Sequence, residues 1–180
     1  MKHSHTRQSP LTFHWPHPPL RVALVEPEIP PNTGNIARLC AATQTPLHLV
    51  GKAGFRLTDS QVRRAGLDYW DSVDLVRHST LSDFETAVTG QRMFLFSTRG
   101  PTAYTAVTYR PGDFLVFGPE SKGLPDDLLD RHPGTVLTIP MQTEHVRSLN
   151  LATTVGIVLY EALRQINASS LCSGDSDGIQ

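Results

Sequence analysis

The chain has 180 residues, of which 39% are hydrophobic and 18% charged, which suits one domain with a sizeable core and not two. Its 16 Lys and Arg against 17 Asp and Glu give a formal charge of -1, which excludes a general polyanion binder. A nucleic acid partner would have to be held by a local cationic patch. The longest apolar runs are shorter than the ~20 residues of a membrane span, so we expect no transmembrane helix.

The two ends of the chain are predicted to be disordered tails. Residues 1–20 contain four His and four Pro and lack the apolar centre of a secretory signal. Those histidines have no Cys partners or fixed spacing, so we expect no metal site. Residues 168–180 are polar and Gly/Ser-rich, which leaves a predicted domain at 21–167. With only Cys40 and Cys172, no disulfide framework is expected, and a reducing, cytoplasmic environment is indicated.

Short β-rich runs alternate with helical patterns along the chain. The expected strands are 21–27, 46–51, 92–98, 113–120 and 135–140. Each contains a continuous apolar run, which is typical of a parallel strand covered on both faces. We therefore predict an α/β fold with a mainly parallel sheet and helices on both faces. In such sheets ligands bind at the loops that leave the carboxyl ends of the strands.

The first of these loops, EPEIPPNTGN, leads into the first predicted helix. Asn32 or Thr33 is expected to cap the helix, and Ile36 and Cys40 lie on its apolar face at ~100° per residue. Arg38 points away from that face. It is either an ordinary solvent-facing arginine or, because the neighbouring loop is rich in Asn, part of a site.

An arginine cluster follows the second expected strand. Arg56, Arg63 and Arg64 form either a cationic patch for nucleic acid or a solvated helix face with Asp59 and Asp68 nearby. The spacing does not decide between these two interpretations.

The stretch FGPESKGLP, at 117–125, is the second loop of interest. Gly118 permits a close backbone approach, Pro119 fixes the turn, and Glu120 lies at the mouth of the loop. Neither G-x-x-x-x-G-K-[ST] nor G-x-G-x-x-G occurs, so a nucleotide triphosphatase or an ordinary dinucleotide enzyme is unsupported. A structural Gly-Pro turn is the alternative, but it does not explain an acid and a lysine in so tight a loop.

The stretch MQTEHVRSLNLATTVGIVLYEALRQ places a polar run before a helix that is apolar on nearly every side. Ser148 or Asn150 is expected to cap this helix. A helix of this kind needs burial on more than one side, which favours packing on the sheet and on a second copy over a monomer. A hydrolase pair of Ser148 with His145 lacks a third orienting group, so capping is the preferred role of Ser148.

Five ordered motifs carry a resemblance to a known family: EPEIPPNTGNIARLCAAT, RRAGLDYW, FGPESKGLP, IPM and SLNLATTVGIVLYEA. The chain resembles the SPOUT superfamily of RNA methyltransferases and, within it, the TrmL (YibK-type) family, which 2'-O-methylates the wobble nucleotide, C or U at position 34, of tRNA. The resemblance implies a single-domain α/β fold with a C-terminal trefoil knot. It also implies S-adenosylmethionine as cofactor, no metal, and a cytoplasmic homodimer whose partner subunit helps to form the RNA site.

The resemblance further implies two sets of site residues. The cofactor is expected to contact Phe96, Ser97, Gly118, Ile139, Ser148 and Leu149. Catalysis is expected to depend on Arg38, with Asn32, Glu120, Ser148 and Asn150 orienting the ribose and Arg38. A guanidinium is a poor base because its pKa exceeds about 12. We therefore expect Arg38 to stabilise the phosphate and the developing alkoxide.

Two rival interpretations stay open. The chain could keep the fold and cofactor but methylate another tRNA or rRNA site, or it could be a knotted RNA-binding dimer without catalysis. The presence of Arg38, Asn32 and Glu120 argues against the second. The segment QTEHVR is a residue longer than expected of wobble enzymes, which leaves the contacts of 143–145 open. The sequence does not indicate the tRNA isoacceptors, a preference for C or U, a need for earlier modifications, or a role for the His-rich tail.

Overall fold

A computed structural model describes residues 13–55, 72–142, 144 and 146–174. The arginine cluster and the RRAGLDYW motif therefore lie outside the described residues. The strands are β1 (Arg21–Val25), β2 (Leu47–Val50), β3 (Leu75–His78), β4 (Met93–Phe96), β5 (Thr102–Ala103), β6 (Phe114–Phe117) and β7 (Val136–Thr138). The helices are α1 (Pro30–Thr43), α3 (Leu81–Ala87), α4 (Asp126–Arg131), the 3-10 turn η2 (Pro133–Thr135) and α5 (Leu151–Gly174). All five expected strands are present; β3 and β5 were not predicted.

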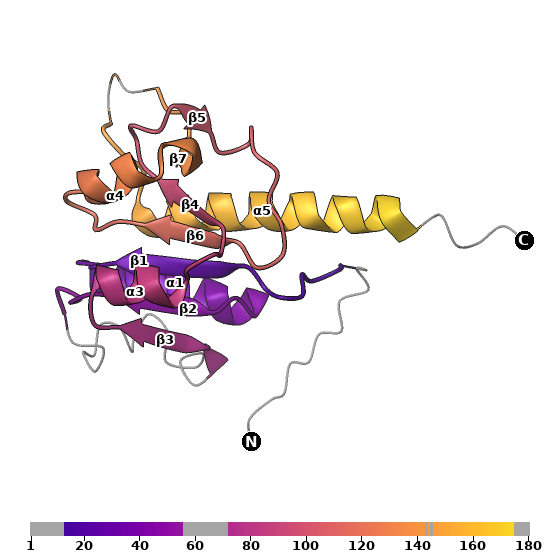
Figure 1. The fold of residues 1–180 in the computed structure, drawn as a ribbon, viewed down its shortest axis with the longest axis horizontal. Coiled ribbons are helices and arrows are strands. Elements are labelled where there is room, and N and C mark those ends of the chain that lie inside the picture. Colours follow the sequence, from indigo (N-terminus) through magenta and orange to yellow (C-terminus); the bar gives the residue numbers. More distant parts are fainter. Residues whose placement is uncertain (1–12, 56–71, 143, 145, 175–180) are drawn as a thin grey trace, which may run out of the picture.

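The described strands form one sheet in the order β3-β2-β1-β6-β4-β7-β5, and every recorded pairing is parallel (Figure 1). The chain runs outward from β1 through β2 to β3 and then crosses to the other side of β1. The loops after β1 and β6 consequently diverge at a topological switch point, which is where open parallel sheets bind ligands. The α/β prediction is confirmed, and the trefoil knot stays a prediction.

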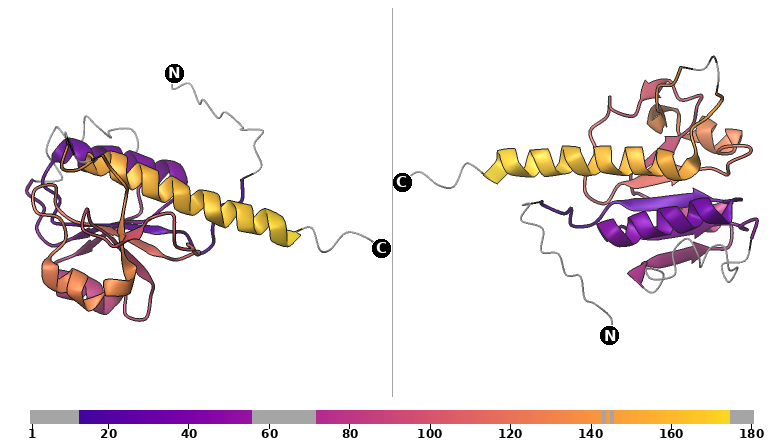
Figure 2. Two further views of the ribbon diagram at one scale, coloured as in Figure 1. Left: turned by 90° about the horizontal axis from the view of Figure 1, so that it is seen from above. Right: turned by 180° about the vertical axis from the view of Figure 1, so that it is seen from behind.

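Helices cover both faces of the sheet, as the continuous apolar strands require. Leu115 and Phe117 of β6 belong to the core beneath α1 and α5, whereas Phe114 and Val116 belong to the core beneath α3 and α4. Figure 2 shows the sheet between these two helical layers. Cys40 packs in the first core, and burial raises the pKa of its thiol to about 12, so it is an inert packing residue.

The start of α1 differs from the prediction. The N-cap is Ile29, not Asn32 or Thr33, and Pro30 and Pro31 open the helix. Proline suits these first positions because its missing N–H would have no partner in the helix anyway. The backbone N–H groups of Asn32 and Thr33 donate to the carbonyl of Ile29. The side chain of Asn32 is therefore available for contacts outside its own helix.

Helix α5 lies beside α1 across one face of the sheet (Figures 1 and 2). The side-chain oxygen of Asn150 accepts hydrogen bonds from the N–H groups of Ala152 and Thr153, which confirms Asn150 as its cap and leaves Ser148 without that role. The helix continues to Gly174, past residue 167, where we expected the folded domain to end. None of the described helices is long and apolar enough to cross a membrane.

Candidate functional site

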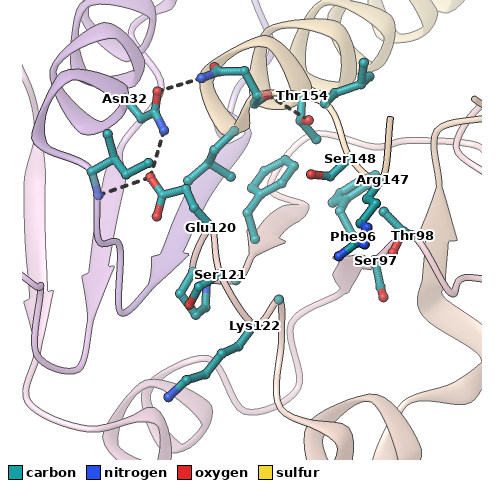
Figure 3. A pocket seen from close by; sticks show the side chains of 18 of the residues that line it. Asn32, Phe96, Ser97, Thr98, Glu120, Ser121, Lys122, Arg147, Ser148 and Thr154 are labelled. Carbon is teal, nitrogen blue, oxygen red and sulfur yellow. Dashed lines mark hydrogen bonds between the residues drawn. The ribbon is translucent and has the colours of Figure 1, made fainter. Parts of the chain in front are cut away.

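A cavity of about 530 Å³ opens at the carboxyl edge of the sheet, where the loops after β1, β4 and β6 meet the residues that precede α5 (Figure 3). We call it the rim cavity. Most of the predicted site residues line it: Asn32, Phe96, Ser97, Gly118, Glu120, Ser148, Leu149 and Asn150. Ile139 lines an adjoining side cavity of about 90 Å³, together with Phe96, Ser148 and Leu149. Residues from four separate stretches of the chain thus meet at one place.

Arg38 is the predicted site residue that lines neither cavity. It lies on the exposed face of α1, six residues beyond Asn32. At ~1.5 Å of rise and ~100° of turn per residue, Arg38 is ~9 Å along the helix and on a different face from Asn32. The prediction that Arg38 points away from the core is confirmed, and its role in catalysis stays a prediction.

Glu120 is the centre of a hydrogen-bond network at the back of the rim cavity. Its carboxylate accepts from the N–H of Glu28 at 2.8 Å, from the N–H of Ile29 at 3.3 Å and from the side-chain amide of Asn32 at 2.8 Å. These neutral donors satisfy the carboxylate without cancelling its charge. Glu120 thereby joins the loop after β6 to the start of α1.

Glu28, in the loop after β1, makes the reciprocal contact with the loop after β6. Its carboxylate accepts from the backbone N–H of Ser121 at 3.0 Å and from the Ser121 hydroxyl at 2.8 Å. The loops after β1 and β6 are thus held together by two carboxylates, each bound by the other loop. Glu28 and Ser121 were not predicted as site residues. Their only signal in the sequence is the paired acids of EPE and the acid and serine of PES.

Asn32 extends the network to α5. Its side-chain oxygen accepts from the amide nitrogen of Asn150 at 2.8 Å, as Figure 3 shows. Since Asn150 also caps α5, one chain of contacts links Glu120, Asn32, Asn150 and the first turn of that helix. Ser148 and Leu149, immediately before the cap, are positioned over the cavity by this chain.

Gly118 is required by close backbone packing. A Cβ atom at Gly118 would lie 2.3 Å from the carbonyl carbon of Gly123 and 2.3 Å from the nitrogen of Leu124. The loop after β6 therefore folds back directly on its own first residue, as the close approach predicted at Gly118 requires. A Cβ at Gly100 would similarly lie 2.5 Å from the carbonyl carbon of Leu137, so the loop after β4 packs directly on the backbone of β7.

Positive charge predominates around the rim cavity. Three of its lining residues are cationic, Arg99, Lys122 and Arg147, whereas Glu120 is the one carboxylate among the lining residues that the structure describes. Arg99 is held by Asp126 of α4, and this hydrogen bond and ion pair raise the pKa of the Arg99 guanidinium above its ordinary value. The balance of charge suits an anionic ligand.

The opposite wall is apolar. The rings of Phe96 and Phe117 stack with their centroids 4.8 Å apart, and Leu149 lies at the junction of the rim and side cavities. A mostly apolar wall combined with a few fixed polar groups is typical of a small-molecule pocket. No group of three or more His, Cys, Asp or Glu side chains within the described ranges is placed to hold a metal ion.

A parallel α/β sheet with a ligand cavity at its switch point, closed by a capped helix, is the architecture of a nucleotide- or cofactor-binding α/β enzyme. Comparison with known proteins narrows this class. The profile of the SpoU rRNA Methylase family matches residues 19–160. The chain belongs to this family.

The chain covers nearly the whole length of two relatives and just over half of a third. The chain is 47% identical over 148 residues to the tRNA (cytidine(34)-2'-O)-methyltransferase of Escherichia coli K12, which covers 82% of this chain and 94% of that relative. A solved structure from work on the 2-OH methylation of C/U34 on tRNA superposes with a TM-score of 0.77 at 50% identity, covering 81% of this chain and 95% of the other. The AdoMet-bound rRNA methyltransferase of Sinorhizobium meliloti superposes with a TM-score of 0.72 at 29% identity, covering 81% of this chain and 56% of the other.

Proposed function

We propose that this protein transfers a methyl group from S-adenosylmethionine to the 2'-hydroxyl of the wobble nucleotide, C or U at position 34, of tRNA. The observation that carries the proposal is the convergence of the predicted site residues on one cavity, in a chain 47% identical to an enzyme named for this reaction. Because tRNA is the substrate in this proposal, we also place the protein in the cytoplasm.

The rim cavity and its side cavity fit the cofactor. Phe96, Ile139 and Leu149 offer apolar walls for an adenine ring, while Ser97 and Ser148 offer hydroxyl groups. Gly118, at the start of the loop after β6, also lines the rim cavity. When bound, S-adenosylmethionine supplies a methyl group activated by the adjacent sulfonium, so the protein needs no metal to make a leaving group.

The remaining task of the protein is to position the ribose hydroxyl and assist loss of its proton. Glu120 is unsuited to be the base, because its carboxylate already accepts three N–H groups. Its role is to fix Asn32 and, through Asn150, the residues over the cavity. We assign Arg38 to the phosphate and the developing alkoxide, where a permanent positive charge lowers the barrier.

The position of Arg38 supports a homodimer. Arg38 lines neither the rim cavity nor its side cavity, yet it lies on the exposed side of α1, and α1 lies beside α5. Helix α5 leaves Tyr160 53% exposed although its neighbours Val158 and Leu159 are fully buried. A second copy packed on α5 covers Tyr160 and brings Arg38 of one subunit towards the rim cavity of the other.

Mixed dimers test this arrangement. Arg38→Ala removes the guanidinium, and Leu149→Asp places a charge in the apolar part of the cavity; each variant alone should be nearly inactive. If Arg38 serves the partner's cavity, unfolding and refolding the two variants together should restore part of the methyl transfer. If sedimentation shows that the mixture contains dimers and methyl transfer is still not restored, Arg38 acts at the cavity of its own chain.

The reaction is tested with methyl-labelled S-adenosylmethionine and tRNA from cells that lack the modification. The proposal expects label on tRNA and none on ribosomal RNA. Label on ribosomal RNA alone would support the rival substrate. Absence of both transfer and cofactor binding, the latter followed by calorimetry, would support an RNA-binding protein without catalysis.

A further inference from the structure

A second cavity lies on the other side of the loop that carries Glu120. It has a volume of about 340 Å³, near the lower end of the range for small-ligand pockets. Pro119, Lys122 and Gly123 line both this cavity and the rim cavity, so the loop from 119 to 123 forms the partition between them. We call it the flanking cavity.

The two cavities open on opposite faces of the sheet at the same edge. Val25 and Leu124, which line the flanking cavity, belong to the core beneath α3 and α4. Phe96 and Phe117, which line the rim cavity, belong to the core beneath α1 and α5. A strand of RNA with one nucleotide in the rim cavity therefore has a neighbouring nucleotide within reach of the flanking cavity.

Glu26, which lines the flanking cavity, has an unusual backbone. Its φ is 45°, in the left-handed region that residues other than glycine seldom adopt. The conformation is held by a 2.8 Å hydrogen bond from the Glu26 N–H to the carbonyl of Val50. A Cβ atom at Gly51 would lie 2.9 Å from the Glu26 Cγ, so glycine at 51 leaves room for this side chain. Backbone strain of this kind is concentrated at ligand sites.

The chemistry of the flanking cavity matches a nucleobase. Val25, Leu81 and Leu124 offer apolar surface for the faces of a ring. Within the part of the chain that the structure describes, neither the Glu26 carboxylate nor the Lys122 ammonium has a hydrogen-bonded partner. A carboxylate accepts hydrogen bonds from exocyclic amino groups of bases, and an ammonium attracts phosphate.

We propose that the flanking cavity receives the base of a nucleotide next to the methylated one. Glu26 accepts a hydrogen bond from the exocyclic amino group of that base, which favours adenine, cytosine or guanine over uracil. Lys122, on the partition between the two cavities, pairs with the phosphate that joins the two nucleotides. The inference rests on the proposed function. It assigns the protein a second point of sequence recognition, because RNA-binding proteins read unstacked bases of single-stranded loops in this way.

The test combines changes in the protein with changes in the RNA. Full-length tRNA is assembled from two halves, so that the nucleotide on either side of the target can carry a base without its amino group: purine for adenine, hypoxanthine for guanine or uracil for cytosine. For wild-type protein, losing the amino group on one side should raise KM about tenfold. Glu26→Gln keeps an acceptor oxygen but loses the charge that strengthens the bond, so it should raise KM about threefold on unaltered tRNA and leave it nearly unchanged on the altered tRNA, with kcat and cofactor affinity preserved.

Two further variants make the result decisive. Glu26→Asn removes the carboxylate with a residue that tolerates a left-handed backbone, and should behave as Glu26→Gln does. Asp74→Asn removes an exposed carboxylate at the opposite, amino-terminal edge of the sheet and should leave KM unchanged.

Equal effects of Glu26→Gln on altered and unaltered tRNA, or no effect on either, would overturn the flanking cavity as a base site while leaving the proposed reaction intact. If wild-type protein methylates no tRNA, the proposed function and this inference both fail.

Discussion

Strand β6 carries a carboxylate at each end, and the two are satisfied in different ways. Asp113, before its first residue, is 2% exposed and accepts from the Arg92 guanidinium at 2.8 Å and from the N–H of Arg110 at 2.7 Å. Glu120, after its last residue, accepts only from neutral groups: the N–H groups of Glu28 and Ile29 and the amide of Asn32. One carboxylate is neutralised by a cation; the other keeps its charge.

The two carboxylates lie at different edges of the sheet. We infer that the amino edge, with Asp113, serves stability and that the carboxyl edge, with Glu120, serves function. Burial raises the pKa of Asp113, and the hydrogen bonds from Arg110 and Arg92, with the charges of these two residues, partly oppose that rise. At the carboxyl edge, amide donors fix Glu120 in place, so Lys122 and Arg147 stay available for an anionic ligand, whereas Arg99 is paired with Asp126. We therefore expect changes at the amino edge to lower stability and changes at the carboxyl edge to lower activity.

The largest expected effect is at the functional edge. Arg38→Ala should lower kcat for tRNA methylation by about 100- to 1,000-fold, because it removes charge stabilisation that acts in the transition state. Cofactor affinity and melting temperature should stay nearly unchanged, since Arg38 is exposed on α1. Radiolabel kinetics measure kcat, and calorimetry measures cofactor affinity and the melting temperature. Arg110→Ala, an exposed arginine at the amino edge, is the matched control; parallel loss of cofactor binding in Arg38→Ala would place Arg38 in the cofactor pocket instead.

The second-largest expected effect is a loss of stability at the amino edge of the sheet. Asp113→Ala should lower the free energy of unfolding by about 2 kcal/mol, because it leaves the N–H of Arg110 without its acceptor and removes the ion pair of Arg92, which keeps only the carbonyl of Thr108. Denaturant titration measures the loss, and kcat of the folded protein should be unaffected. A large fall in kcat at unchanged stability would show that the two edges are not separate.

A buried histidine on the α3 and α4 face should make stability depend on pH. Burial, then the charges of His78 and Arg21, lower the pKa of His48 from 6.5 to about 4. In the unfolded chain His48 takes up a proton near its ordinary pKa, so the stabilisation is complete above pH 6.5 and is lost as the pH falls towards 4. Between pH 6.5 and about 5 the free energy of unfolding should fall by about 2 kcal/mol.

His48→Gln is the control for this slope. Glutamine keeps a hydrogen-bonding group opposite His78, whose ring nitrogen lies 2.9 Å from that of His48, but it does not titrate. Denaturant titrations of both proteins across this pH range should show the slope in the wild type alone. An identical slope in His48→Gln would assign the acid sensitivity to other groups.

The smallest expected change in stability is at the cap of α5. Asn150→Ser retains a capping oxygen but removes the amide donor to Asn32, so the free energy of unfolding should fall by less than about 1 kcal/mol. Methyl transfer should nevertheless fall by about tenfold, because Asn32 loses its link to the residues over the cavity. Activity that tracks the small stability loss would mean that the network only supports the fold.

The features that short stretches of sequence determine were predicted correctly. The apolar runs at 21–27 and 113–120 identified buried parallel strands, and the residue types before a long apolar helix limited its cap to Ser148 or Asn150, of which the structure selects Asn150. It did not predict the N-cap of α1, because two consecutive prolines at Pro30 and Pro31 are better first-turn residues than the Asn and Thr after them. Strand β3 was missed since its residues LVRH are only partly buried at the edge of the sheet.

The site, like the fold, was predictable only in part. The ordered motifs named the residues of the rim cavity, and the structure brings most of them together. The reciprocal contacts of Glu28 with Ser121 and of Glu120 with the start of α1 join residues about ninety positions apart, which no local pattern can pair. The same holds for the flanking cavity, since only the folded sheet places Glu26 beside Lys122.

The most direct test of the account is the position of the methyl group. Unmodified tRNA is incubated with protein and S-adenosylmethionine, digested with a sequence-specific nuclease and analysed by mass spectrometry, with Arg38→Ala in parallel. We predict one added methyl group on the ribose of nucleotide 34, strongly reduced in the variant. A methyl group on a base, or on the ribose of any other nucleotide, would contradict it.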